Sequence, residues 1–306
     1  MGRALIPELV AEGFEVHAAS RTATAVPQAV RSIRADLLED DLSGYLTDVD
    51  AIVHLAGRAH IMREGGDHPE AEYMRQNRDL TRRLAETASS AGVQHLVFAS
   101  SIKVVGETSR SHPFSERTPC TPADAYGRSK LAAEVALAKV ASGSELNVTI
   151  LRPPLMYGAG VKGNLLRLMR LIERRVPLPL GAVRSKRSLL GVRNFASAIL
   201  SALRAPRAGC RTYLVTDGEP VSMPELVVSM ATSLGRAPHL FNVPDTLLAL
   251  AARLTGRTAE LGRLTLPLVI DDRLIRQELG WSPTHPFHEG IREMALSYKA
   301  AAKIST

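Results

Sequence analysis

The sequence is poor in the residues that build disulfide frameworks, metal sites and nucleic-acid stacking surfaces. Only two of its 306 residues are cysteines, Cys120 and Cys210, and neither lies in a CxxC or Cys/His cluster. Aromatic residues make up 4% of the chain, which is too few for the stacking platforms of a single-strand binder. The net charge of +7 is scattered rather than gathered in one basic run. We therefore expect no bound metal and no nucleic-acid partner.

Long apolar runs are lacking as well. The stretch 247–252 is apolar but far too short to span a bilayer, and no signal-peptide pattern is present. Hydrophobic residues make up 45% of the chain and charged residues 23%, which is ordinary for a globular protein. The sequence therefore predicts a cytoplasmic protein that keeps its thiols reduced and does not insert into a membrane.

Short apolar stretches alternate with helical stretches through the first half of the chain. Strands are predicted at 14–19, 50–57, 94–101 and 147–152, and helices at 2–13, 73–91 and 126–140. This alternation is typical of a Rossmann-like, doubly wound parallel sheet with helices on both faces. Beyond residue 152 the pattern weakens, although helices at 194–205 and 223–234 and a strand at 212–216 are still predicted.

We accordingly expect an α/β fold in two parts. Residues 1–152 would form a nucleotide-binding core, interleaved with residues 188–216. Residues 153–306 would mainly form a smaller α/β substrate-binding part at the C-terminal end.

A tyrosine and a lysine four residues apart, Tyr126 and Lys130, share one face of a predicted helix. An ammonium group beside a phenol should lower the tyrosine pKa, so that it can exchange a proton with a substrate oxygen. The spacing alone is weak evidence, because most such pairs form a solvated helix face. Ser101 strengthens the evidence for a site. It lies at the carboxyl end of a predicted strand, and ligands of open parallel sheets bind beyond the carboxyl ends of the strands.

Several segments together resemble the extended short-chain dehydrogenase/reductase family, and within it the nucleotide-sugar epimerase and reductase branch. They are SSIKVVG at 100–106, YGRSK at 126–130, RPPLMYG at 152–158 and HLAG at 54–57, with further matches at Asp36, Leu37, Asn77 and 271–281. The resemblance covers essentially the whole chain. It implies that Ser101, Tyr126 and Lys130 are catalytic, with Tyr126 as the acid and base.

The resemblance also implies two sets of binding residues and a homodimer. The positions implied for the nicotinamide cofactor are Gly2, Arg21, Asp36, Leu37, Leu55, Ala56, Gly57, Asn77, Tyr126, Lys130, Pro154 and Leu155. Those implied for the substrate are Ser101, Lys103, Tyr126, Asn164, Arg187 and Arg263. Arg187 is the main candidate for the substrate diphosphate, because a guanidinium suits phosphate oxygens.

The sequence departs from the family at the glycine loop that receives the cofactor pyrophosphate. That loop follows the first strand, whereas this chain starts at the last glycine of the loop, Gly2. We expect either a true start further upstream or weak cofactor binding, and a sheet whose first strand is missing. The cofactor is expected to be NADP or NAD. The stretch 18–21 has no carboxylate for a ribose hydroxyl, and Arg21 could meet the 2′-phosphate of NADP.

The choice of reaction depends on a missing acidic pair. Dehydratases of the family carry one beside the catalytic serine or threonine, whereas Ile102 and Lys103 follow Ser101 here, so dehydration is not expected. Similarity to a subgroup acting on UDP-N-acetylated hexosamines favours a 4-ketoreductase of UDP-2-acetamido-2,6-dideoxyhexos-4-ulose, serving bacterial polysaccharides such as O-antigen. The alternatives are a UDP-hexose or UDP-N-acetylhexosamine 4-epimerase, and a non-catalytic nucleotide-binding protein on the same fold.

Overall fold

The structure is a computed structural model. It describes residues 1–22, 26–58, 69–109, 111–205, 208–254, 256 and 258–304.

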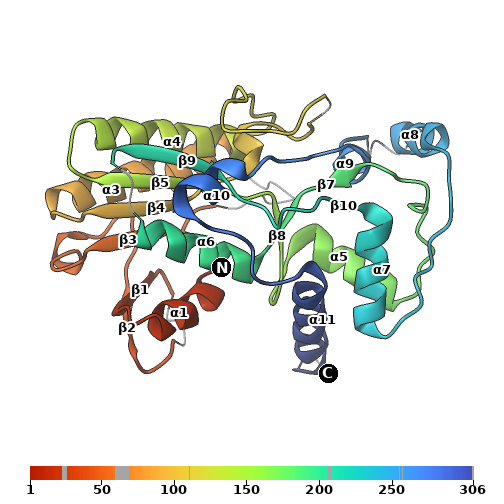
Figure 1. Cartoon of the computed structure of the whole chain (residues 1–306), viewed down its shortest axis with the longest axis horizontal. Helices are drawn as coiled ribbons and strands as arrows, with labels where there is room; N and C mark the ends of the chain where they lie inside the picture. Colours follow the sequence, from red (N-terminus) through yellow and green to blue (C-terminus); the bar gives the residue numbers. More distant parts are fainter. Residues whose placement is uncertain are drawn as a thin grey trace.

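A four-stranded parallel sheet forms the centre of the molecule. Its strands are β3 (Ala51–His54), β4 (His95–Ala99), β5 (Asn147–Arg152) and β9 (Cys210–Leu214), in the order β3-β4-β5-β9. Helices α3 (Leu80–Ser90) and α4 (Ala125–Ser142) cover one face, and α6 (Val192–Arg204) covers the other (Figure 1). Every residue of β4 is buried, as expected for a parallel sheet covered on both faces. The α/β class and the Rossmann-like sheet are thereby confirmed.

The N-terminal strands form a second parallel sheet. Helix α1 (Gly2–Ala11) leads into β1 (Val16–Ser20), which pairs with β2 (Val30–Arg34). Among the described residues, β1 pairs only with β2 and β3 only with β4, so the sheet is divided between β1 and β3. The apolar stretch at 50–57 predicts a buried strand, but three of the four residues of β3 are half-buried. Among the described residues, β3 has a neighbouring strand on one side only.

The helical segment after β3 is not one regular α-helix. The sequence predicts a continuous helix over 73–91, but the structure has a short α2 (Pro69–Tyr73), a π-helical stretch (Met74–Asp79) and then α3. A π-helical turn widens the backbone and often marks a functional site. Two short 3-10 helices, Ser43–Tyr45 and Ile102–Val104, complete this half.

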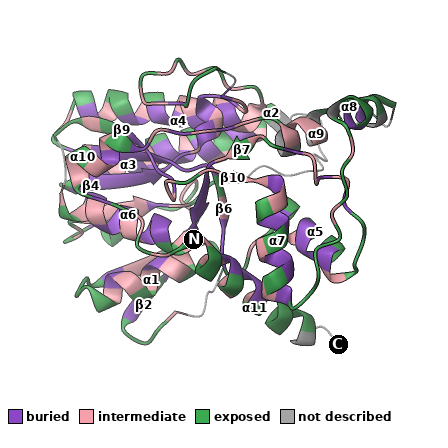
Figure 2. Ribbon diagram, turned by 45° about the vertical axis from the view of Figure 1, so that its right-hand side comes forward, coloured by how far each residue is buried: buried purple, intermediate pink, exposed green. Residues whose placement is uncertain are grey.

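The C-terminal half has a separate apolar core. Strands β6 (Leu155–Tyr157) and β8 (Leu189–Gly191) are parallel, while β7 (Lys186–Arg187) and β10 (Val221–Ser222) are antiparallel. The helices are α5 (Gly163–Glu173), α7 (Met223–Leu234), α8 (Asp245–Leu254), α9 (Thr258–Thr265), α10 (Arg273–Leu279) and α11 (Phe287–Ile304). The buried sides of α5, α7 and α11 meet around side chains such as Met169, Val227 and Met294 (Figure 2).

The described part of the chain contains no helix that is both long enough and apolar enough to cross a membrane.

Candidate active site

Ser101 and Tyr126 meet where the carboxyl end of β4 touches the start of α4. Ser101 lies just beyond β4 and caps the 3-10 helix Ile102–Val104, its Oγ accepting the Lys103 amide at 3.3 Å. Asp124 caps α4, its Oδ1 accepting the Gly127 amide at 2.7 Å. This places Tyr126 in the first turn of α4, where its phenol hydrogen-bonds Ser101.

Gly127 permits this close approach of α4 to the 3-10 helix. A Cβ on Gly127 would lie 2.7 Å from the carbonyl oxygen of Lys103 and 3.0 Å from Pro122. Since real Cβ contacts are longer than this, any larger residue would push Tyr126 away from Ser101.

Lys130 lies one helical turn after Tyr126 and is 6% exposed. Its Nζ donates to the carbonyl oxygen of Ala99 at 2.7 Å and lies 4.2 Å from the centroid of the Phe98 ring. Burial lowers the Lys130 pKa to about 7, and the nearby Glu134 opposes that shift. The lysine can therefore change charge near neutral pH.

The expected lowering of the Tyr126 pKa is wrong for this structure. Burial raises the pKa to about 12, Asp124 and Tyr73 add to the rise, and the hydrogen bond from Ser101 opposes it. Lys130 adds no charge effect, because its own pKa of about 7 leaves it neutral at the pH where the phenol titrates. The phenol is therefore protonated at neutral pH in the absence of a ligand.

Asn77 ties the loop after β3 to the same helix. The side chain is buried in the π-helical stretch, and its Oδ1 accepts the Arg58 amide at 2.8 Å. Its Nδ2 donates to the Ser129 hydroxyl at 2.8 Å and to the Arg58 carbonyl oxygen at 3.1 Å. Because Ser129 lies between Tyr126 and Lys130 in the sequence, Asn77 fixes the loop against the part of α4 that carries these two residues.

The loop at Ala56 and Gly57 fits a dinucleotide approaching that face. Both residues are exposed, and Gly57 has a φ of 146°, which is strained for any other residue. A Cβ on Gly57 would lie 2.7 Å from Asn77 Oδ1 and 3.9 Å from Lys130 Nζ. The Arg58 Nε next to it is buried without a hydrogen-bond partner among the described residues. The Gly57 backbone, the buried Lys130 amine and the unsatisfied Arg58 Nε together suit the ribose and amide oxygens of a nicotinamide nucleotide.

The other implied cofactor positions lie on several elements. Gly2 opens α1, where an added Cβ would meet no atom within 4 Å. Arg21 is exposed just after β1, and Asp36 accepts the Leu38 amide at 2.9 Å in the turn after β2. The remaining positions are a half-buried Leu37 and Leu55, a buried Pro154 and an exposed Leu155 that opens β6.

The implied substrate positions are also dispersed. The Lys103 ammonium pairs with Asp124 Oδ2 at 2.5 Å and Glu107 Oε1 at 3.0 Å. Arg187 lies on β7, where its Nη1 donates to the Leu266 carbonyl oxygen at 2.6 Å and burial lowers its pKa. Asn164 is exposed in the first turn of α5. Arg263 belongs to α9, but its side chain lies outside the described residues.

Sequence reasoning missed three side chains that hold this cluster: Asp124, Glu134 and Arg152. Asp124 precedes the predicted helix and could have been identified as its N-cap. Glu134 and Arg152 form a buried ion pair, with side chains 5% and 8% exposed. The signal in the sequence for Glu134 was its position eight residues after Tyr126, which places it on the same helix face.

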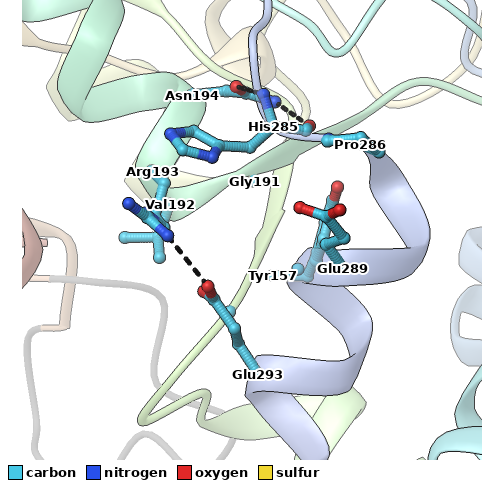
Figure 3. Close-up of a pocket in the computed structure, with 11 residues that line it drawn as sticks. Tyr157, Gly191, Val192, Arg193, Asn194, His285, Pro286, Glu289 and Glu293 are labelled. Carbon is cyan, nitrogen blue, oxygen red and sulfur yellow. Dashed lines mark hydrogen bonds and ion pairs between the residues drawn. The ribbon is translucent and has the colours of Figure 1, made fainter.

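A cavity in the C-terminal half is a different feature (Figure 3). It lies where the start of α6 meets α11, and its described lining includes none of Ser101, Tyr126 and Lys130. The side chain of Asn194 donates to Asp217 at 2.7 Å and to the His285 carbonyl oxygen at 2.9 Å. This network joins α6, the segment after β9 and the segment before α11, and we regard it as structural.

A Rossmann-like parallel sheet with serine, tyrosine and lysine side chains gathered at its carboxyl edge defines a nucleotide-dependent enzyme of the short-chain dehydrogenase/reductase type. The family model described as the NAD dependent epimerase/dehydratase family matches residues 1–215. The chain therefore belongs to this family, whose cofactor is NAD, and the resemblance seen in the sequence is confirmed.

Individual relatives agree with this assignment. A UDP-glucose 4-epimerase from Vibrio cholerae is 36% identical over 258 residues, covering 84% of this chain and 79% of the relative. A 3-diazoavenalumate denitrifying reductase from a Streptomyces species is 30% identical over 94% of this chain and 93% of the relative. The solved structure of MoeE5 in complex with UDP-glucuronic acid and NAD is 26% identical, has a TM-score of 0.79 and covers 98% of this chain and 96% of that chain.

Proposed function

We propose that the protein is an NAD-dependent 4-epimerase of a UDP-linked hexose or N-acetylhexosamine. The observation that carries the proposal is the Ser101, Tyr126 and Lys130 cluster in a chain 36% identical to a UDP-glucose 4-epimerase. The comparisons thus favour the epimerase alternative over the predicted 4-ketoreductase, which is not confirmed. The ketoreductase stays the second candidate, because an exposed Arg21 follows β1 and the stretch 18–21 has no carboxylate.

The cofactor would bind along the loop from Leu55 to Gly57 and reach Tyr126 and Lys130. When bound, NAD supplies the oxidising equivalent, taking a hydride from C4 of the sugar and returning it to the opposite face. The buried Lys130 would hold the ribose hydroxyls, and Gly57 leaves room for their close approach. The Asn77 bonds to Arg58 and Ser129 would keep this loop in place.

Tyr126 would move the proton. Its phenolic oxygen takes the proton of the sugar 4-hydroxyl and later returns it, while Ser101 hydrogen-bonds the same sugar oxygen. The pKa of about 12 must fall for this step. The Ser101 hydrogen bond already lowers it, and an ammonium group closer to the phenol would lower it further.

Arg187 is our candidate for the substrate diphosphate, since its guanidinium is held in place by Leu266 and suits phosphate oxygens. Lys103 is less suited, because its charge is shared with two carboxylates. Asn164 and Arg263 remain further candidates. We also propose the division into a core at 1–152 with 188–216 and a substrate-binding part, and a homodimer formed through α3 and α4.

The stoichiometry of the cofactor tests the reaction. The protein should interconvert UDP-glucose and UDP-galactose, or their N-acetylated forms, without net consumption of reduced cofactor. A reductase would instead consume one NADH or NADPH for each 4-keto sugar reduced. Absence of interconversion, with stoichiometric oxidation of NADPH, would overturn the epimerase proposal.

The variant Tyr126→Phe tests the site. General acid and base groups contribute roughly 10²- to 10⁴-fold to a rate, so turnover should fall by at least that much. Thermal unfolding should change little, because the ring and its packing are kept. Turnover within about twofold of the wild type would remove Tyr126 from the assigned role.

A further inference from the structure

Three consecutive residues at the end of β4 each contact a different turn of α4. The Lys130 ammonium donates to the carbonyl oxygen of Ala99, and the Ser101 hydroxyl hydrogen-bonds Tyr126. Between them, the Ser100 hydroxyl donates to the Glu134 carboxylate. Tyr126, Lys130 and Glu134 are spaced four residues apart on α4 and so share one face of the helix. The strand end is therefore fastened to the helix at three successive turns.

Glu134 also fastens this pair of elements to β5. Arg152, the last residue of β5, donates from Nε to Glu134 Oε1 at 3.0 Å and from Nη2 to Oε2 at 2.6 Å. Such a two-point contact fixes orientation as well as distance. Arg152 directly precedes Pro153, whose carbonyl oxygen accepts the Ile102 amide at 2.9 Å. One carboxylate thus joins β4, β5 and α4 beside the catalytic cluster.

The geometry points to Glu134 as a positioning residue of the active site. Its carboxylate holds the ends of β4 and β5 against α4, so that Ser101, Tyr126 and Lys130 keep one relative placement. Glu134 itself is buried, 5% exposed, and its carboxylate bonds to Ser100 and Arg152 instead of to the three catalytic side chains. The inference deepens the proposed function and rests on it for the catalytic assay.

A packing role alone would not need a charged pair in this place. Burying an ion pair is costly, and apolar residues of similar volume often give equal or greater stability. A buried pair is therefore better explained by the geometry and charge that it imposes on its neighbours. Glu134 fixes the geometry through its bonds to Ser100 and Arg152. Its negative charge also raises the pKa of Lys130, against the effect of burial.

The variant Glu134→Gln tests this role by two measurements. With NAD and the UDP-sugar, kcat should fall about 10- to 100-fold with little change in KM, because reacting groups are misplaced while substrate binding is kept. In ¹³C-lysine NMR of the ligand-free protein, the Lys130 titration midpoint should move below that of the wild type, since a favourable negative charge is lost.

Thr149→Val is the matched control. Thr149 bonds His95 at 2.9 Å, and this buried contact ties the same strands, β4 and β5, away from their carboxyl ends. The control should lower stability yet leave kcat and the Lys130 midpoint unchanged. If Glu134→Gln behaves like this control in both measurements, the inference is overturned.

A double variant covers the case in which Glu134→Gln does not fold because Arg152 is left unpaired. Glu134→Gln with Arg152→Met removes both charges and should restore stability but not kcat. Wild-type kcat in the double variant would also overturn the inference. If the wild-type protein shows no epimerase activity, the proposed function fails, while the Lys130 titration still decides the role of Glu134.

Discussion

At the scale of single residues, the candidate catalytic side chains take their charge and placement from neighbouring elements, since Lys130 donates to the carbonyl oxygen of Ala99 and Tyr126 is buried. Ser101, Tyr126 and Lys130 were found from spacing and strand position, and the structure brings them together. The predicted sign of the Tyr126 pKa shift was wrong, because the burial of Tyr126 and of Lys130 depends on tertiary contacts. Glu134 was missed for a related reason, since a glutamate on a helix is usually solvated.

Gly57 should tolerate no side chain. Gly57→Ala would place a Cβ 2.7 Å from Asn77 Oδ1 at a φ of 146°. Backbone strain of this kind costs about 1–3 kcal/mol, so the free energy of unfolding in urea should fall by that amount or more. NAD binding, measured by fluorescence titration, should weaken as well.

Gly92→Ala is the control for that change. Gly92 also has a positive φ, 80°, but an added Cβ meets no atom within 4 Å. The control should lose some stability and keep its NAD affinity. Equal NAD affinity in the Gly57 and Gly92 variants would contradict the proposed place of the cofactor.

Two buried histidines should make the protein sensitive to acid. Burial lowers the pKa of His54 to about 3 and that of His95 to about 4, from 6.5. The unfolded chain therefore takes up protons that the folded chain refuses, and the free energy of unfolding falls as pH drops from about 6.5 towards 3. Urea unfolding at a series of pH values measures this. The variant His95→Gln should reduce the slope between pH 6.5 and pH 4, and an unchanged slope would rule out the His95 contribution.

At the scale of helices and strands, the regular core was more predictable than its irregular neighbours. The strand at 147–152 and the helix at 223–234 were predicted with the observed bounds. Strand β2 was not predicted, because its sequence VRSIR carries two arginines and three of its residues are exposed. The π-helical stretch was missed as well, since its register depends on the buried contacts of Asn77 and not on helix propensity.

The start of α7 gives an element-scale prediction. Ser222 and Glu225 form a capping box, in which the Ser222 amide donates to Glu225 Oε2 at 2.7 Å and the Glu225 amide donates back to the Ser222 hydroxyl. Ser222→Ala should lower the free energy of unfolding by about 1 kcal/mol, measured by urea denaturation. Lys162→Ala at the start of α5, which has no side-chain cap, should change it by under about 0.5 kcal/mol. Equal losses in the two variants would argue against the capping contribution.

At the scale of the whole molecule, the alternation of strands and helices was sufficient to predict the parallel sheet. Among the described residues, β1 and β2 form a sheet apart from the four-stranded sheet β3-β4-β5-β9. What could not be predicted was the half-burial of β3, because the covering of a strand depends on its neighbours in space.

The divided sheet predicts uneven protection of the backbone. Amides of β3 should exchange with deuterium faster than those of β4, because β4 is paired on both sides and β3 on one. Mass spectrometry of peptides covering 51–54 and 95–99 measures the difference. Equal protection of the two strands would show that the outer edge of β3 is covered in solution.

The same division affects how the protein should be handled. In the described part of the chain, β1 and β3 each present one edge with no strand beside it, and such edges are templates for strands from other molecules. Concentrated samples should therefore acquire cross-β aggregates with time, even when the active site is intact. An added extended peptide that pairs with the free edge of β1 or β3 should therefore slow this aggregation.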